Sequence, residues 1–194
     1  VIEGTDLVFV NQETPVATSV FEPSNYPLFN TPSETVTDLK SAGFNLFNLA
    51  SNHTLDKGVR GMEATLDFMD SVQGITHFGC YRNYTDEHTP RLVEKNGITF
   101  AFIGVTEMTN GMSLPSDTEL DIVYTSQTEK IQAMLSEAKE AADVVVLSCH
   151  WGDENVLAAD QRQKDMAANF AEWGAGIIIG HHPHVLLVIE NLST

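Results

Sequence analysis

The chain has 194 residues, and its 27 acidic against 10 basic side chains give a formal charge of −17. Because 42 % of the residues are hydrophobic and only 19 % are charged, the composition excludes an acidic disordered tail and predicts a single domain over residues 1–194. The few Lys and Arg residues are scattered singly, which argues against nucleic acid as a partner, since phosphate backbones are bound by clustered cations.

The same charge constrains any anionic substrate. A polyanion is repelled over long range, so a site for an anionic polymer or a phosphate-containing molecule needs positive charge from another source. A bound metal ion is the obvious source.

The chain termini and the cysteines give little information about where in the cell the protein works. No apolar run approaches the roughly 18 to 20 residues that cross a bilayer, so we expect no membrane contact by this segment. The chain starts at Val1 and enters a strand-like run at once, which predicts a natural N-terminus upstream. Cys80 and Cys149 make no disulfide framework and leave the compartment open.

Apolar runs of strand length alternate with segments of helical period, which predicts an α/β fold whose strands are buried on both faces. In chain order we expect strands over 6–11, 44–50, 75–78, 91–95, 98–105, 143–149, 176–179 and 185–189, and helices over 32–43, 59–72, 126–142 and 160–173. The patterns Thr31-x-x-Glu34 and Ser126-x-x-Glu129 predict capping boxes, and Asn96-Gly97 predicts a hairpin turn.

Polar clusters follow four of the expected strands. They are Asn11-Gln12-Glu13, Ser51-Asn52-His53, His150-Trp151-Gly152-Asp153-Glu154 and His181-His182-Pro183-His184. Because the carboxyl ends of strands in α/β sheets form one rim where ligands bind, we expect these clusters to converge. Taken singly, most of them also fit a turn, a helix cap or a solvated surface.

The last cluster is harder to explain structurally. Three imidazoles in four residues repel one another when charged and need partners when buried and neutral. In an extended backbone, His182 and His184 point to one side, which suits two nitrogens on one cation. His nitrogens mixed with Asn and carboxylate oxygens favour Mn, Fe or Zn over Ca, and no thiolate set for a zinc finger is present.

Six ordered motifs then resemble one known family over nearly the whole chain. They are Asn11-x-Glu13-Thr14-Pro15, Phe29-Asn30-Thr31-Pro32, Leu39-Lys40-x-Ala42-Gly43-Phe44, Leu49-Ala50-x-Asn52-His53-x-x-Asp56-x-Gly58, His150-Trp151-Gly152-x-Glu154 and Gly180-His181-His182-Pro183-His184-Val185. The pattern is similar to the bacterial capsule-synthesis CapA family, which includes the PgsA-type proteins of poly-γ-glutamate production.

The resemblance implies a calcineurin-like metallophosphoesterase fold, a four-layer α/β/β/α sandwich of two sheets flanked by helices. It also implies roles: Asn52, His150, His182 and His184 as ligands of one or two divalent ions, and His53 as the catalytic residue that protonates a leaving group.

The chain departs from the typical phosphoesterase pattern at its first cluster. Where the Asp of a Gly-Asp pair bridges two metals, this chain has Val10-Asn11, so Asn11 and Glu13 are expected at the metal, with Glu154 as a further substitute carboxylate. An Asp-x-His-like motif on a preceding strand is missing, which predicts a domain truncated at its N-terminus.

Three functions follow from these observations. The first is a metal-dependent hydrolase or transferase of capsule biosynthesis, acting on a phosphate ester or a polymer-linked bond. The second is a non-catalytic polymer-binding or scaffold component of a capsule synthesis or export complex, with membrane-bound capsule synthesis proteins as partners. The third is a carbohydrate- or peptide-binding module with incidental histidines. The resemblance places the protein at the cell surface, anchored through an N-terminal segment absent here.

Overall fold

The computed structural model describes residues 2, 4–187 and 189–192, which form two β-sheets packed face to face. The first sheet holds three parallel strands in the order β1-β2-β3, which span Phe9–Asn11, Leu46–Asn48 and Thr76–Phe78. The second sheet has the order β4-β5-β6-β7, spanning Arg91–Lys95, Ile98–Thr106, Val144–His150 and Ile177–His181. In this sheet only the β4–β5 pair is antiparallel.

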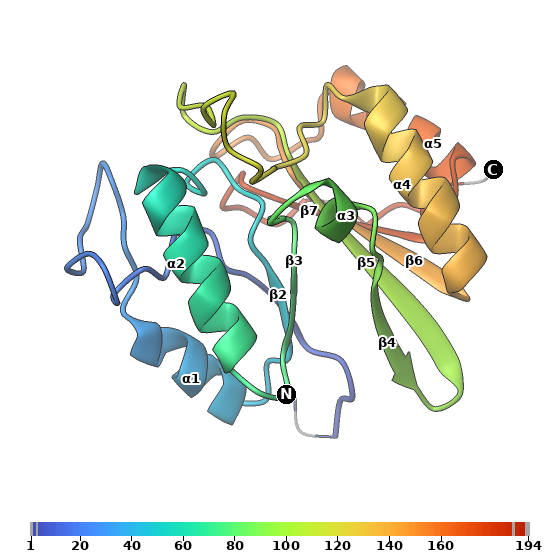
Figure 1. The fold of residues 1–194 in the computed structure, drawn as a ribbon. Helices are drawn as coiled ribbons and strands as arrows, with labels where there is room; N and C mark the ends of the chain where they lie inside the picture. The colour runs from blue at the N-terminus through green and yellow to red at the C-terminus, as the bar shows by residue number, and fades with distance from the viewer. Residues whose placement is uncertain (1, 3, 188, 193–194) are drawn as a thin grey trace.

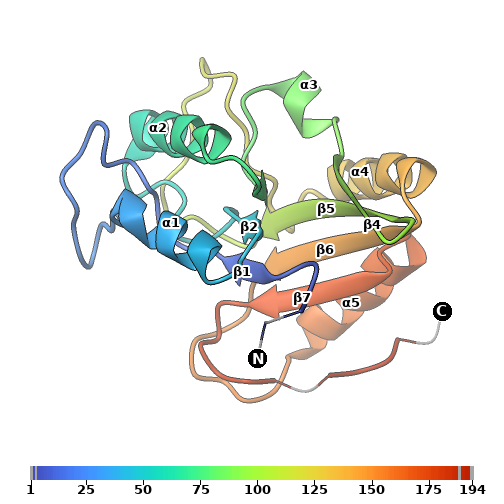
Figure 2. The same ribbon diagram turned by 90° about the horizontal axis from the view of Figure 1, so that it is seen from below.

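Helices cover the outer face of each sheet, as Figures 1 and 2 show. Helices α1 (Ser33–Ser41) and α2 (Gly58–Ser71) pack on the three-stranded sheet, and α4 (Thr128–Ala141) and α5 (Gln161–Glu172) pack on the four-stranded sheet. A short helix, α3 (Tyr84–Glu87), lies in the connection between β3 and β4. The molecule is therefore a four-layer α/β/β/α sandwich, which confirms the predicted fold class.

Alternation along the strands decides which side chains face the other sheet. In β6, Val145 and Leu147 pack against the helices, whereas Val146 packs between the two sheets. Ser148 and His150 follow Val146 on the inner face, so the strand aims both of them at the three-stranded sheet. This placement is what brings His150 into the site described below.

Two glycines let the sheets approach closely near that site. A Cβ atom on Gly104 of β5 would lie 2.3 Å from Asn48 Oδ1 and 2.8 Å from the Cα atom of Gly79. Gly79 itself has a positive φ of 95° and no room for a side chain beside Ala50. The ends of β2, β3 and β5 can therefore meet without a side chain between them.

The Asn96-Gly97 hairpin is confirmed, with positive φ at both residues. Both predicted capping boxes are wrong. Helix α1 begins after Pro32 because the Thr31 hydroxyl pairs with Thr14, and α4 begins after Gln127, whose side chain accepts from the Tyr124 amide. A capping box forms instead at Asp160 and Gln163 of α5.

The strand predicted over 185–189 is also wrong for the residues the structure describes. Residues 185–187 and 189 have no strand pairing, and residue 188 lies outside the described residues. Within the described part of the chain, the helices are all too short or too polar to cross a bilayer.

Candidate metal site

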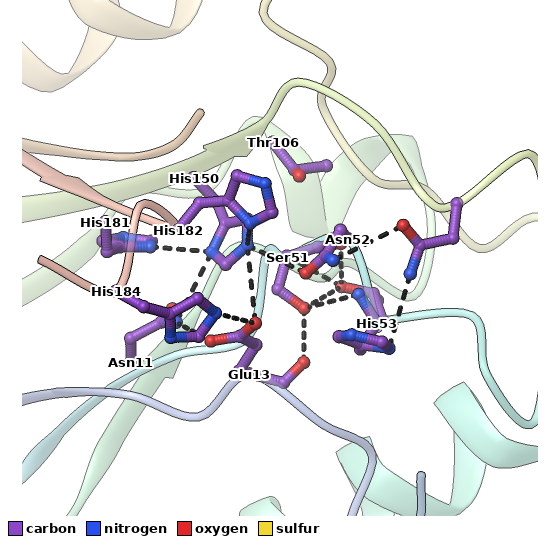
Figure 3. A network of polar contacts seen from close by, with 12 residues as sticks. Asn11, Glu13, Ser51, Asn52, His53, Thr106, His150, His181, His182 and His184 are labelled. Atoms are coloured by element: carbon purple, nitrogen blue, oxygen red, sulfur yellow. Dashed lines mark hydrogen bonds and ion pairs between the residues drawn. The ribbon is translucent and has the colours of Figure 1, made fainter. Parts of the chain in front are cut away.

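The carboxyl ends of the parallel strands bring the predicted clusters together, as Figure 3 shows. Asn11 ends β1, His150 ends β6 and His181 ends β7. The segment after β2 adds Asn52 and His53 from the facing sheet. Residues up to 173 positions apart in the sequence (184 − 11) thus meet at one edge of the sandwich.

His150 lies at the centre of this site. Its side chain is 1 % exposed, and its Nε2 atom is 2.9 Å from Asn52 Oδ1 and 3.1 Å from His182 Nδ1. Burial, followed by the neighbouring His181 and His182 rings, lowers the pKa of His150 to about 2. The ring is therefore neutral at physiological pH, the state in which an imidazole can bind a metal.

Two overlapping groups of donor atoms could hold a divalent ion. One comprises Glu13, His150 and His182, and the other Glu154, His182 and His184, with the donor atoms of each group within 4.8 Å of one another. Glu13 Oε1 is 3.9 Å from His150 Nε2 and 3.7 Å from His184 Nε2. Carboxylate oxygens mixed with imidazole nitrogens fit a first-row divalent ion, so the residues present suit the predicted metal.

His182 and His184 converge by a different route from the predicted one. They do not continue an extended strand, because the backbone turns after β7 with φ values of 99° at His182 and 56° at His184. These left-handed conformations are uncommon for a residue with a side chain, and such strain tends to occur at functional sites. The turn directs both rings back toward Glu154.

His53, the predicted catalytic residue, lies at the rim of the site and is held by a buried carboxylate. Its Nδ1 atom is 2.8 Å from Asp56 Oδ2, and the same oxygen accepts from the Phe29 amide. The Phe29 ring packs edge-on against the imidazole with 4.8 Å between centroids. These contacts engage Nδ1 and leave Nε2 without a hydrogen-bond partner among the described residues.

Asn11 has its amide committed within the protein. Its Oδ1 accepts from Asn48 Nδ2 at 2.8 Å, and its Nδ2 lies 3.4 Å from both Glu13 Oε2 and His150 Nδ1. The side chain therefore lies against both Glu13 and His150, and its predicted role as a ligand stays a prediction.

Sequence reasoning did not single out Asn110, which lies between Asn52 and His53. Its Oδ1 is 3.4 Å from Asn52 Nδ2, and its Nδ2 is 3.4 Å from His53 Nδ1. The Asn110-Gly111 dipeptide, with positive φ at both residues, was the available turn signal. His77 and His88, which lie outside the predicted clusters, pair with Asp70 and Glu137 away from the site.

The four-layer sandwich, with a His, Asn and carboxylate cluster at its strand ends, is a metallophosphoesterase-like fold. The description "Bacterial capsule synthesis protein PGA_cap" belongs to the family model that matches residues 1–193. The chain belongs to this family.

Two curated relatives agree with that membership. The chain is 34 % identical over 197 residues to the PGA biosynthesis protein CapA of Bacillus subtilis (strain 168), a match covering 98 % of this chain and 50 % of that protein. It is 30 % identical over 195 residues to the capsule biosynthesis protein CapA of Bacillus anthracis, covering 95 % and 46 %. The chain spans about half the length of these relatives.

A solved structure is similar in fold. The "Putative 5'-Nucleotidase" of Staphylococcus aureus superposes with a TM-score of 0.55 at 20 % identity, over 82 % of this chain and 33 % of that one. At this identity the likeness shows the fold alone.

Proposed function

We propose that this chain is a metal-dependent hydrolase-type domain of capsule or poly-γ-glutamate biosynthesis, acting on a phosphate ester or a polymer-linked bond. The observation that carries the proposal is the convergence of Glu13, His150 and His182 on one side of the Asn52-His53 pair. Family membership supports the biological setting.

The chain's own residues have distinct parts in this proposal. Glu13, His150 and His182 would hold one divalent ion, and Glu154 and His184 could extend the site toward a second. A bound ion would neutralise the anionic group of the substrate and polarise the bond that is cleaved. His53, held through Nδ1 by Asp56, would donate a proton from Nε2 to the leaving group.

One experiment tests this proposal directly. Bis(p-nitrophenyl) phosphate, p-nitrophenyl phosphate and poly-γ-glutamate are each incubated with the chain and Mn²⁺ or Zn²⁺, and nitrophenolate release and polymer length are measured. We expect turnover of at least one substrate that EDTA abolishes and that His53→Gln lowers about 100-fold, the low end for general acid catalysis. His88→Gln is the matched control, because His88 pairs with Glu137 outside the site. Turnover that survives both EDTA and His53→Gln would refute the proposal.

A specific observation also favours the second candidate, a non-catalytic polymer-binding component. The neutral Asn11 is committed to Asn48 at the place where a typical two-metal phosphoesterase has a carboxylate. That candidate predicts metal-dependent retention of poly-γ-glutamate without cleavage in the same assay.

Location and partners are part of the proposal. The capsule biosynthesis relatives support work at the cell surface, with an anionic polymer or a phosphate-containing molecule as substrate. Membrane-bound capsule synthesis proteins would be the partners, and an N-terminal anchor would hold the domain near them. Co-purification of the full-length protein with the membrane fraction would test this placement.

A further inference from the structure

His181 is the one histidine of the His181-His182-Pro183-His184 cluster that belongs to neither donor group. Both of its ring nitrogens face partners inside the protein. Nδ1 is 2.8 Å from His150 Nδ1, and Nε2 is 2.6 Å from the hydroxyl of Ser148, which is fully buried. Ser148, His181 and His150 therefore form one hydrogen-bonded chain that ends at the metal site.

The geometry fixes which nitrogen of His150 can carry the proton when a cation is present. A neutral imidazole has one N–H and one lone pair, so a ring that offers Nε2 to a metal must be protonated on Nδ1. That proton needs an acceptor. The two described side-chain groups near Nδ1 are His181 Nδ1 at 2.8 Å and the Asn11 amide nitrogen at 3.4 Å, and an amide N–H can only donate.

His181 is therefore the acceptor, and its own proton must lie on Nε2, where it is donated to the Ser148 hydroxyl. The hydrogen bonds can also run in the opposite direction, with a donor and an acceptor at every step. Ser148 then donates to His181 Nε2, His181 Nδ1 donates to His150 Nδ1, and His150 Nε2 donates to Asn52 Oδ1 at 2.9 Å. Both directions leave two neutral rings and one hydroxyl, so the change requires no net gain or loss of protons.

We propose that His181 is a positioning residue that, together with Ser148, holds His150 in the tautomer whose Nε2 is free for a divalent metal. This inference rests on the metal-dependent function proposed above. An ion at Nε2 would require the arrangement in which the His150 proton lies on Nδ1 and the hydrogen bonds run from His150 through His181 to Ser148. Partners of this kind, beyond the direct ligands, typically contribute 10- to 100-fold to metal affinity.

Two substitutions separate positioning from simple space filling. The Oδ1 atom of Asn is two bonds from Cβ, as is Nδ1 of His, so His181→Asn keeps an acceptor for the His150 proton. The amide atoms of Gln are three bonds from Cβ, as is Nε2 of His, so His181→Gln keeps the contact with Ser148 but not the one with His150. Binding of Zn²⁺ to the 194-residue chain is measured by isothermal titration calorimetry, with His77→Gln as the control outside the site.

We expect His181→Gln to weaken zinc binding by about 10- to 100-fold and His181→Asn to stay within about 3-fold of the wild type. His77→Gln should bind as the wild type does. An equal loss in the Asn and Gln variants would show that His181 only fills space, and no loss in either would show that it has no part in metal binding. Both results overturn the inference while the wild type still binds zinc, whereas a wild type that binds no zinc refutes the proposed function itself.

A second measurement reads the tautomer without reference to affinity. Long-range ¹H–¹⁵N spectra of the histidine rings distinguish a protonated Nδ1 from a protonated Nε2. We expect His150 to be protonated on Nε2 without zinc and on Nδ1 with zinc in the wild type and in His181→Asn. A His150 ring that keeps its proton on Nε2 in the wild type at full zinc occupancy would overturn the inference, because Nε2 would then not face the metal.

Discussion

Two groups of partly buried titratable side chains in this protein differ in how their charge is balanced. Around Glu87 of α3, the ammonium group of Lys130 lies 3.0 Å from Glu87 Oε2 and 2.6 Å from Asp121 Oδ2. At the metal site, Glu13 and Glu154 face imidazoles, and neither has an ion pair with Lys or Arg among the described residues.

The difference indicates what each group is for. The Glu87 group carries its own cation and needs nothing from solution, so it reads as a structural link between α3, α4 and the segment containing Asp121. The candidate metal-site group has two carboxylates and the neutral His150 ring, and neither carboxylate has a Lys or Arg partner among the described residues. A partly buried site whose carboxylates have no Lys or Arg partner among the described residues is suited to receive a cation from outside.

The largest effect is expected from His150→Ala, which removes the residue shared by most contacts at the metal site. We expect the affinity for Zn²⁺ to fall by about 100-fold or more, because a direct ligand should matter at least as much as a residue that orients one. The rise in melting temperature that saturating zinc gives the wild type should disappear. His88→Ala is the control, and unchanged zinc binding in His150→Ala would contradict the assignment of the site.

The second-largest effect is expected where the two sheets meet at Gly104. This contact lies beside the candidate metal site and not beside the Glu87 group. Gly104→Ala places a methyl group 2.3 Å from Asn48 Oδ1 and 2.8 Å from the backbone of Gly79, so the sheets must separate. We expect a loss of about 3 kcal/mol in the free energy of unfolding, the upper end for overpacking.

Gly176→Ala is the matched control, because the nearest atoms to its added Cβ lie at an ordinary 3.6 Å. Its free energy of unfolding should stay within about 0.5 kcal/mol of the wild type. Urea unfolding of both variants, followed by zinc titration of the folded Gly104→Ala protein, measures the effect. Equal stability of the two variants would show that the sheets do not need this close approach.

Much of the fold could be predicted because its signals are local. The Asn96-Gly97 turn, the apolar spacing of Met62, Leu66 and Met69 and the polar residues after each strand are readable in a short window. Parallel strands then force those polar residues to one edge, so convergence required no knowledge of distant contacts.

The parts that failed depend on contacts between distant segments. Thr31 does not cap α1 because Thr14 takes its hydroxyl, and His182 and His184 leave the extended conformation after β7. The role of His181 was equally hidden, since nothing in the spacing of three histidines says which one faces Ser148. Such choices are decided by tertiary packing, which local patterns do not contain.

The third effect tests whether Lys130 balances the Glu87 group. Lys130→Met leaves two carboxylates close together without their shared cation, and Glu87 is almost fully buried. We expect a loss of about 2 kcal/mol at pH 8, less than for a fully buried pair because Lys130 and Asp121 are partly exposed. Lys139→Met, in the last turn of the same helix, should have little effect. Equal unfolding midpoints in urea for the two variants would show that the ion pair is dispensable.

The smallest effect is a pH dependence that the Glu87 group should have on its own. Burial, followed by the Asp121 carboxyl, raises the pKa of Glu87 to about 7 from an ordinary value of 4.5. Between these two values the folded protein binds more protons at Glu87 than the unfolded chain does, so the free energy of unfolding falls as the pH rises through this window.

Glu87→Gln cannot ionise, and its stability relative to the wild type should increase by about 1 to 2 kcal/mol between pH 4.5 and 7.5. Urea unfolding at several pH values measures this difference, in which the titration of the site histidines cancels because both proteins share it. Glu129→Gln, at an exposed position of α4, should show no such trend. A difference between Glu87→Gln and the wild type that does not change with pH would mean that Lys130 keeps Glu87 ionised throughout, with both carboxylates sharing one ammonium group.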